Sequence, residues 1–345
     1  MDERIRQAVG AEPAWVVGGA LRDELLGRTI VDTDVACADP ELAARLYSRL
    51  ARGAVFPLSE RHGAWRVAFR SGTTVDFTPL HGGTIEEDLG TRDFTVNAMA
   101  RPLEGGALID PLGGEADLEA RRLRAVSPGI FEDDALRLLR AVRLEGELGF
   151  ELDMETEKLA RRFARRAAEP AGERLLGELE RLSPAGFRRA DALGLLAALG
   201  GSLERLGDVD VVDTPGFLLT VVFGEGLRRF PISNDLSRLV RTLVAAERPA
   251  DDSAREIHRF RRRTEPWALT ALAYLGATDL YEAVRAARAA EPPEPLLRGE
   301  DLLELGVEAG PEIGRLLELV AEERAAGAIA TRDEALELAR RKLSA

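Results

Sequence analysis

Two aspartates, Asp32 and Asp34, stand two residues apart in the run Ile30 to Val35, which contains neither glycine nor proline. This run predicts a β-strand, and side chains two apart on a strand point to the same face, roughly 7 Å apart along it. Neighbouring carboxylates repel each other unless a cation lies between them. Hard oxygen ligands suit Mg²⁺, which usually takes one or two carboxylates together with substrate phosphates. The spacing therefore predicts a magnesium site at this pair.

A glycine pair, Gly18-Gly19, precedes the aspartates in the chain. It follows the apolar Val16-Val17, so we expect a strand that runs into a tight turn and then a helix over residues 20–26. Glycines in such a turn let backbone N–H groups come close to a triphosphate. Taken alone, each signal is weak, because most such aspartate pairs are solvated loop carboxylates. Together, the turn and the aspartates predict metal-assisted nucleotidyl transfer.

A third carboxylate, Asp76, lies in the second of two alternating segments, residues 65–69 and 73–77. The alternation predicts two strands, with a hairpin turn at residues 70–72. A third carboxylate beside the first two is what a two-metal site uses to position or deprotonate an attacking hydroxyl. The alternative is an aspartate on the surface of an edge strand.

The stretch from residue 18 to residue 34 contains the pattern GG-x-x-RD, then LGR, then D-x-D. This arrangement resembles the head signature of the tRNA nucleotidyltransferases and bacterial poly(A) polymerases, class II members of the polymerase-beta superfamily. The resemblance implies that Asp32 and Asp34 hold two Mg²⁺ ions and, with Asp76, carry out catalysis. It further implies triphosphate binding by Gly18, Gly19 and Arg22, and His62-Gly63 also matches the family's pattern.

Residues 92–98, RDFTVNA, resemble a second motif of the family, RDFT-x-NA. In the family its aspartate and asparagine lie near the ribose of the bound nucleotide, which implies that role for Asp93 and Asn97. A carboxylate and an amide can hydrogen-bond ribose hydroxyls, and Arg92 can bind phosphate. The alternative for Asp93 is a simple helix N-cap.

Two further motifs have predicted structural roles. Residues 110–118 resemble the family's DP-x-GG-x-x-DL, in which Asp-Pro sets a turn and the glycines allow a tight connection. Residues 173–179 resemble ER-x-x-x-EL, which we expect to pack helices together.

Residues 131–150 predict one helix with acidic residues at its start. Asp134 and Arg137 are three residues apart and share a helix face. The simplest interpretation is therefore an intrahelical ion pair worth roughly a few tenths of a kcal/mol. The segment also resembles the family's ED-x-x-R, in which the protein replaces a template. There the carboxylate accepts from the exocyclic amine of C or A, a donor that G and U do not present, and the arginine donates to the ring. The resemblance implies nucleotide binding by Asp134, Arg137 and Arg140, whereas Asp133 departs from the usual Glu.

The net charge and the distribution of basic residues limit the kinds of binding partner that the chain can have. The 345 residues carry a net charge of −13, which argues against broad non-specific nucleic-acid binding but leaves room for a local basic groove. The densest basic run, residues 255–263, is either a phosphate-contacting face for tRNA or a solvated helix surface. One cysteine, Cys37, fits a reducing cytoplasm. No apolar stretch approaches the length of a membrane span, and oligomeric state is left open.

An abundance of Ala, Leu, Arg and Glu favours helices over most of the chain. We therefore expect an α+β protein with a small mixed-sheet head followed by an all-α neck, body and tail. The expected domains are a nucleotidyltransferase head at residues 1–125, a base-recognising neck at residues 126–182, and a body and tail at residues 183–345 that bind tRNA.

The reaction implied is transfer of CMP, AMP or both from CTP or ATP to a tRNA 3′ end, with release of pyrophosphate. A poly(A) polymerase usually begins its base-reading element with Arg rather than an acid. A non-catalytic RNA-binding relative would lack the metal ligands, and a small-molecule nucleotidyltransferase would lack RDFT-x-NA. Only residues 77–91 separate Asp76 from Arg92. In the family such a short segment goes with enzymes that stop after CC, so CC addition and full CCA addition both stay open.

Overall fold

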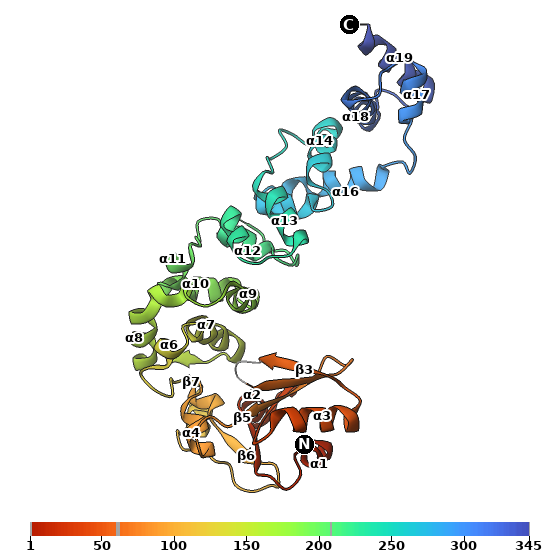
Figure 1. The fold of residues 1–345 in the computed structure, drawn as a ribbon. Helices are drawn as coiled ribbons and strands as arrows, with labels where there is room; N and C mark the ends of the chain where they lie inside the picture. The colour runs from red at the N-terminus through yellow and green to blue at the C-terminus, as the bar shows by residue number, and fades with distance from the viewer. Residues whose placement is uncertain (1, 60–62, 208, 345) are drawn as a thin grey trace. The chain divides into compact units, whose positions relative to one another are not determined.

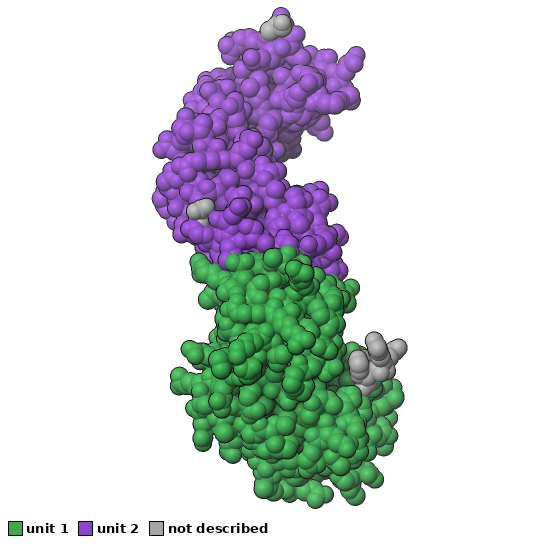
Figure 2. All heavy atoms as spheres, turned by 90° about the vertical axis from the view of Figure 1, so that its left-hand side faces the viewer, with its two compact units in different colours: residues 1–199 green, residues 200–345 purple. Residues whose placement is uncertain are grey.

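The computed structural model describes residues 2–59, 63–207 and 209–344, which form two compact units, residues 1–199 and residues 200–345 (Figures 1 and 2). His62, which matches the family's pattern, lies outside the described residues. The predicted boundaries at residues 125 and 182 both fall within the first unit. The three-domain division stays a prediction.

A six-stranded mixed sheet forms the start of the first unit, as predicted (Figure 1). Its strands follow the order β3-β4-β5-β2-β1-β6, in which β2 and β5 are parallel and every other pair is antiparallel. Their bounds are β1 Ala14–Val17, β2 Asp32–Cys37, β3 Ala54–Ser59, β4 Ala64–Ala68, β5 Thr74–Pro79 and β6 Ala100–Pro102.

The predicted second strand is shifted by two residues. Ile30 and Val31 precede β2 and are exposed, at 38% and 50% of their surface. The strand instead begins at Asp32 and continues through Val35, Ala36 and Cys37, which are buried. The aspartates therefore lie at the open end of β2, where the strand emerges from the core.

One face of the sheet packs against α1 Glu3–Val9 and α3 Pro40–Ala51 (Figure 1). Tyr47 on α3 contacts Phe77 on β5, with ring centroids 5.8 Å apart. Phe77 pairs with Val35 on β2, and both are fully buried. Because paired residues of adjacent strands point to the same face, this apolar row fixes which residues face the opposite side.

The opposite face is covered over only part of its area. Val17, Ala36 and Ala100 pack there against Ile85 and Leu89 of α4. The helices around this face are α2 Gly19–Leu25, α4 Ile85–Gly90, the short 3₁₀ helix η1 Thr95–Asn97 and α5 Gly114–Glu119.

The helices that follow the sheet in the first unit begin differently from the prediction. The single helix expected over residues 131–150 is interrupted: α6 ends at Asp133, α7 begins at Arg137, and Asp134 is extended, with φ −148° and ψ 105°. The Asp134 carboxylate accepts a hydrogen bond from the Leu136 amide at 3.1 Å, a local bond that competes with helix formation. Asp134 and Arg137 therefore do not share a helix face.

The other elements of this part of the first unit are short. They are β7 Arg122–Leu123 paired with β8 Glu151–Leu152, α6 Ile130–Asp133, α7 Arg137–Leu148, α8 Met154–Phe163, η2 Ala164–Ala168, α9 Gly172–Leu179, α10 Pro184–Ala192 and α11 Leu195–Leu199.

In the described part of the second unit the regular elements are helical. They are α12 Phe217–Phe223, η3 Gly224–Arg229, α13 Asn234–Val244, α14 Ala254–Thr264, α15 Ala268–Tyr274, η4 Thr278–Leu280, α16 Tyr281–Ala290, α17 Gly299–Glu304, α18 Pro311–Ala325 and α19 Arg332–Leu343. None of the helices in the described residues has the length and apolar character that crossing a membrane requires.

The basic run at residues 255–263 lies on α14 and faces an acidic side of α18. Arg255, Arg259 and Arg262 form ion pairs at 2.6 to 2.9 Å with Glu323, Glu322 and Glu318 respectively. Phe260, within the run, is 1% exposed and packs in the core. These arginines therefore already have carboxylate partners within the unit.

Candidate active site

The predicted catalytic aspartates lie on the partly covered face of the sheet, opposite α3. Asp34 on β2 pairs in register with Asp76 on β5, so the two side chains point to the same face. Asp32 shares that face with Asp34, as predicted, and pairs with Thr74. The Thr74 hydroxyl donates to Asp32 Oδ1 at 2.7 Å. The sheet thus brings the three carboxylates into one area.

Asp34 has no hydrogen-bond or salt-bridge partner among the described residues, so its carboxylate is available to a ligand. Its pKa is raised: burial has the largest effect, the charge of Arg92 opposes it, and the nearby Asp76 and Asp32 add to it. A partly buried carboxylate beside two others is destabilised until a cation binds. Asp34 and the exposed Asp32 therefore fit the role of a ligand pair for a divalent ion.

No three carboxylate, histidine or cysteine side chains within the described ranges gather in a metal-binding cluster. Two protein carboxylates are nevertheless enough for Mg²⁺, which completes its shell with water and substrate phosphates.

Asp76 is engaged differently. Arg66, opposite it on β4, donates to both of its oxygens at 2.7 Å, and Asp76 is 7% exposed. The carboxylate predicted to be the third member of the metal site thus has a bidentate arginine partner. Arg66 is not among the site residues predicted from the sequence, although residues 66 and 76 are equally distant from the centre of the predicted 70–72 turn.

Gly18 occupies a backbone position that a side chain would obstruct. Its φ is +72°, and a Cβ there would lie 3.0 Å from Arg92 Nη1 and 3.1 Å from Asp34 Oδ2. The turn therefore passes directly beside an arginine and a carboxylate, and glycine gives it both the conformation and the space.

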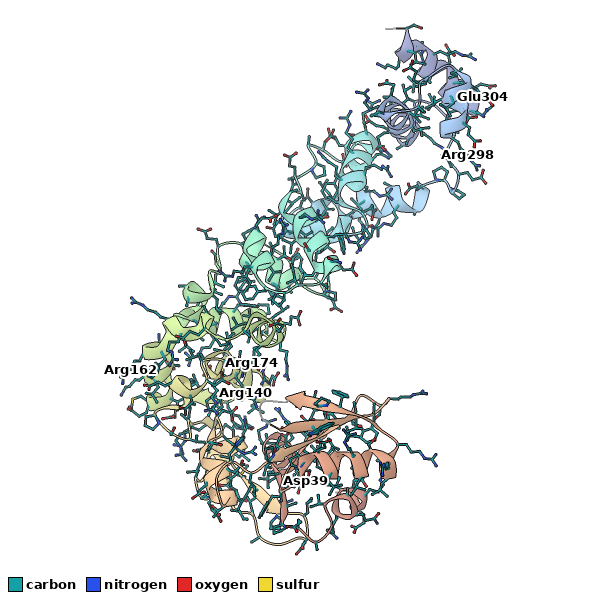
Figure 3. The ribbon with its side chains drawn as sticks, in the orientation of Figure 1. Asp39, Arg140, Arg162, Arg174, Arg298 and Glu304 are labelled. Carbon is teal, nitrogen blue, oxygen red and sulfur yellow. The ribbon has the colours of Figure 1, made fainter. Side chains whose placement is uncertain are left out.

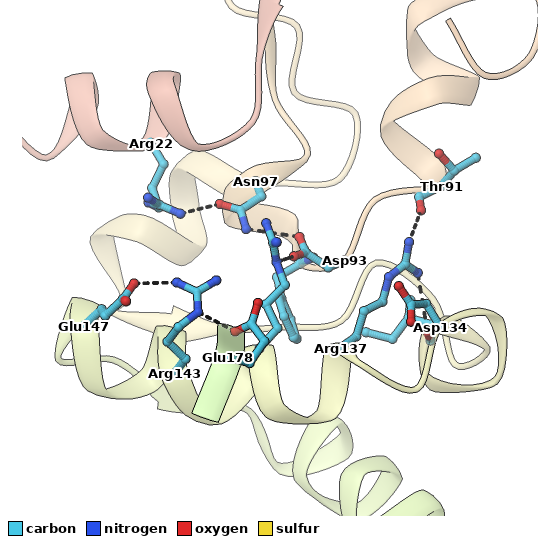
Figure 4. A network of polar contacts seen from close by, with 12 residues as sticks. Arg22, Thr91, Asp93, Asn97, Asp134, Arg137, Arg143, Glu147 and Glu178 are labelled. Atoms are coloured by element: carbon cyan, nitrogen blue, oxygen red, sulfur yellow. Dashed lines mark hydrogen bonds and ion pairs between the residues drawn. The ribbon is translucent and has the colours of Figure 1, made fainter. Parts of the chain in front are cut away.

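The RDFT-x-NA residues form a connected polar cluster (Figure 4). Asp93 accepts from the Phe94 amide at 2.7 Å, from Asn97 Nδ2 at 3.0 Å and from Arg140 Nε. Asn97 Oδ1 accepts from Arg22 Nη1 at 2.7 Å. Burial tends to raise the pKa of Asp93, but the charge of Arg140 and the hydrogen bonds lower it overall.

Asp93 is not the cap of the short helix that follows. The N-cap of η1 is Phe94, and no side chain caps that helix. The simple helix-cap interpretation of Asp93 is therefore wrong, and its carboxylate instead links Asn97 to Arg140.

The predicted base-reading residues both have partners, but not each other (Figure 4). Asp134 forms an ion pair with Arg174 on α9, with Nη2 and Oδ2 2.6 Å apart. Arg137 donates to the Thr91 carbonyl at 2.7 Å. The simple interpretation of these residues as an intrahelical ion pair is therefore wrong.

A pocket of about 250 Å³ joins most of the predicted nucleotide-binding residues. Arg140 and Arg174, on two of the helices that follow the sheet, both line it (Figure 3). Its lining is Gly18, Gly19, Asp34, Arg92, Asp93, Asn97, Asp134, Leu136, Arg137, Arg140 and Arg174. Asp32, Asp76 and Arg22 are not among these residues. Four arginines beside a glycine turn can bind a polyanion such as a triphosphate.

Arg174 was not predicted as a site residue. It belongs to the ER-x-x-x-EL motif, whose Glu178 packs as expected: Arg143 on α7 donates to it, and both are buried. Arg174 lies one turn earlier on α9 and contributes to the pocket. The sequence signal available was the one basic residue within a motif predicted to have only a packing role.

Comparison with known proteins gives related sequences over most of the chain. Residues 14–82 and 67–124 match the poly A polymerase head domain. The chain is 33% identical over 411 residues to an A-adding tRNA nucleotidyltransferase of Deinococcus radiodurans, covering 93% of this chain and 94% of that protein. It is 32% identical over 403 residues to a CC-adding tRNA nucleotidyltransferase of Thermus thermophilus, covering 93% and 92% respectively.

A third relative matches more closely over a shorter stretch. The CC-adding tRNA nucleotidyltransferase of Geobacter sulfurreducens is 43% identical over 176 residues, which are 50% of this chain and 41% of that protein. Among solved structures, the Bacillus stearothermophilus CCA-adding enzyme in complex with CTP aligns with a TM-score of 0.76 and 26% identity, over 99% of this chain and 96% of that one. The fold of this chain is therefore shared along its length with that enzyme.

Proposed function

Because this chain belongs to the tRNA nucleotidyltransferase family, we propose that it adds CMP, AMP or both to the 3′ end of tRNA, using CTP or ATP and releasing pyrophosphate. The observation that carries the proposal is the pocket of about 250 Å³ that joins Asp34 and four arginines with Asp134. Such a pocket combines a carboxylate for a metal, arginines for a triphosphate and a carboxylate for a base. The base can then be selected by the protein, with no nucleic-acid template.

Members of the family are generally metal-dependent, and for this chain we infer two Mg²⁺ ions held by Asp32 and Asp34. The support is the unpaired Asp34 carboxylate beside two further carboxylates. When bound, the ions would activate the attacking 3′ hydroxyl and stabilise the leaving pyrophosphate. Asp76, paired in register with Asp34, lies where it can help orient that hydroxyl, with its own orientation fixed by Arg66.

The triphosphate is assigned to the glycine turn and Arg92. Arg92 uses Nε and Nη2 to hold Asp88, which leaves Nη1, on the side of the Gly18 turn, to donate to phosphate. The backbone amides at Gly18 and Gly19 provide further donors. Arg22 supports this region through its hydrogen bond to Asn97.

The ribose is assigned to Asp93 and Asn97. Each of these side chains is held by other protein groups but keeps hydrogen-bonding capacity: the second lone pair of Asp93 Oδ2 and the second N–H of Asn97 Nδ2. Arg140 fixes the Asp93 carboxylate through a hydrogen bond, and the negative charge of Asp93 in turn raises the pKa of Arg140. The ribose hydroxyls would meet a preformed acceptor and donor.

The base is assigned to Asp134 and Arg137. Cytosine N4 and adenine N6 both donate, so either can bond to the Asp134 carboxylate. Uracil and guanine present carbonyl oxygens at the corresponding position, and an ionised carboxylate cannot donate to them. One pocket can therefore accept C and A and reject U and G.

The test is to incubate the protein and Mg²⁺ with a tRNA that lacks CCA and with labelled CTP or ATP. We expect one to three nucleotides to be added, as resolved on a sequencing gel. A long A tail would identify a poly(A) polymerase, and no addition would identify a non-catalytic relative or an enzyme for small molecules. The same reaction without Mg²⁺ is the control for the metal.

We also infer tRNA as the macromolecular partner and the cytoplasm as the location. The supports are the family and the single, buried Cys37, whose thiol suits a reducing compartment. Cell fractionation with an antibody to the chain, together with gel-shift measurement using tRNA, tests both inferences.

A further inference from the structure

The contact between Asp134 and Arg174 joins two residues 40 positions apart in the chain. Asp134 lies in the non-helical break between α6 and α7, and Arg174 lies in the first turn of α9. Arg174 Nη2 is 2.6 Å from Asp134 Oδ2, and Nη1 is 3.4 Å from Oδ1. Both residues line the pocket, so the ion pair is part of its wall.

The acceptor sites of the Asp134 carboxylate are almost fully occupied. Its Oδ1 accepts from the Leu136 amide at 3.1 Å and from Arg174 Nη1, and its Oδ2 accepts from Arg174 Nη2. A carboxylate offers about four acceptor sites, so one site, on Oδ2, is left for a ligand. The two protein partners thereby determine the direction from which a further donor can approach.

The two base-reading residues are held in place by different means. Arg137 is held by the Thr91 carbonyl at 2.7 Å. Asp134 belongs to an extended segment and is 29% exposed in its side chain, so without Arg174 only its bond to Leu136 would orient it. Its orientation therefore depends on Arg174.

We propose that Arg174 is a specificity-determining residue that acts through Asp134, by fixing the carboxylate so that its free acceptor site faces the amino group of cytosine or adenine. This inference rests on the proposed function, since it deepens the role of the same pocket. Arg174 contacts no base itself. It holds the Asp134 carboxylate in one orientation as a hydrogen-bond acceptor. The amino group of cytosine or adenine can donate to this acceptor, whereas a carbonyl oxygen of uracil or guanine cannot.

The main experiment is Arg174→Ala, assayed for addition of each of the four nucleotides separately to a tRNA lacking CCA. We expect the kcat/KM preference for CTP over UTP to fall about tenfold, the loss that weakening of one charged hydrogen bond brings. Arg174→Lys keeps a donor and should recover part of the preference. This variant also serves if the alanine variant does not fold.

A matched control is Arg181→Ala. Arg181 has a side chain 57% exposed, against 53% for Arg174, and forms an ion pair with Glu147 at 3.0 Å. It is not among the residues that line the pocket. We expect this variant to keep the wild-type preference, and an equal loss in both variants would overturn the proposal.

A double-mutant cycle with Asp134→Ala tests whether Arg174 acts through that residue. If it does, removing Arg174 from the Asp134→Ala protein changes the preference no further. Additive effects would overturn the proposal. So would a uniform rise in KM for all four nucleotides with unchanged preference, which is the result expected if Arg174 contacts the triphosphate.

Equilibrium binding of the four nucleotides, measured without tRNA, separates this inference from the proposed function. If the wild type transfers nothing to tRNA but binds CTP better than UTP, and Arg174→Ala loses that difference, the proposed function fails and the inference stands. If the wild type transfers C or A and Arg174→Ala keeps its preference in both assays, the inference alone fails.

Discussion

At the scale of single residues, Asp34 differs from its charged neighbours in the pocket. Arg92, Asp93 and Asp134 all have ion-pair partners, whereas Asp34 makes no hydrogen bond or ion pair to another described residue. An unpaired and partly buried carboxylate lowers the stability of the folded protein. Stability alone would therefore not favour an aspartate here, and a functional role explains its presence.

We expect Asp34→Asn to abolish transfer without loss of stability. Removing metal binding should lower kcat/KM by at least about a hundredfold, because a bound metal supplies several kcal/mol of charge stabilisation. The thermal midpoint without metal should be equal to or above that of the wild type, because the amide removes an unpaired charge. Asp32→Ala should lose activity similarly, with its fold intact. Full activity of either variant with Mg²⁺ would refute the metal assignment.

Arg137→Ala should relax nucleotide choice, because Arg137 supplies the donors for the base while its hydrogen bond to Thr91 O fixes its position. We expect the preference for C and A over U and G to fall about tenfold or more, as for loss of a charged hydrogen bond. The measurement is addition of each nucleotide in a separate reaction. Unchanged selection would mean that the base is read by other residues.

At the scale of elements, the sequence predicts best where the alternation is regular. Residues 65–69 and 73–77 correspond, to within one or two residues at each end, to β4 and β5. β3 was not predicted, because it contains Pro57, which is tolerated there since β3 is an edge strand.

The interrupted helix shows why part of the site could not be predicted. The helical pattern of residues 131–150 is regular, yet the Asp134 carboxylate bonds its own Leu136 amide and a distant arginine. The first is a local side-chain bond to the backbone and the second is a tertiary contact. The hydrophobic periodicity of the sequence indicates neither of them. The aspartate pair could be predicted because its spacing is local, and the RDFT-x-NA residues because their sequence resembles a family motif. Arg174 could be assigned to the pocket only once α9 was placed.

The short helix η1, which carries Asn97, is held in place by a buried aspartate on α5. Asp117 accepts from the Thr95 hydroxyl at 2.6 Å and from Arg122 and Arg124 at 2.7 and 2.8 Å. Burial tends to raise the pKa of Asp117, but these hydrogen bonds lower it overall. A lowered folded pKa means that the ionised carboxylate stabilises the fold.

We therefore expect Asp117→Asn to lower the thermal midpoint at pH 7, by a destabilisation of roughly 1–3 kcal/mol. The stabilisation from the charge is present above the unfolded pKa, about 3.9, and is lost as pH falls through the lower folded pKa. The difference between variant and wild type should therefore be constant above about pH 5 and shrink below about pH 4. Asp191→Asn, at an exposed position on α10, is the control and should change nothing. A difference that stays constant down to pH 3 would contradict this account.

At the scale of the whole molecule, we infer that the number of nucleotides added depends on how far the site can reorganise from C to A. In the family, a longer flexible segment between the third head strand and RDFT assists that change. Here residues 80–84 alone connect β5 to α4, and Thr91 alone separates α4 from Arg92. The two relatives aligned over most of their length divide between A addition and CC addition.

CC addition and full CCA addition stay the two alternatives. The hypothesis that the enzyme stops after CC rests on this short connection, which leaves little chain that can move. A tRNA lacking CCA should then become two nucleotides longer, whether or not ATP is supplied. A tRNA that already ends in CC should not be extended. Efficient addition of A to either substrate, seen on a sequencing gel, would contradict this expectation.

The ion pairs between α14 and α18 have a consequence for how binding to RNA responds to ionic strength. Each phosphate that a protein neutralises releases condensed counterions, which contributes about 0.7 to 0.9 to the slope of log K against log salt. Arg255, Arg259 and Arg262 are neutralised by glutamates of α18, so they should contribute little to that slope. Glu322→Gln removes the α18 partner of Arg259, which keeps only Glu256 of its own helix at 3.0 Å, and it also removes a second contact of Arg255 at 3.3 Å. We therefore expect a steeper slope for tRNA binding in this variant. An unchanged slope would mean that tRNA does not reach Arg255 and Arg259, and that these two arginines serve to hold α18.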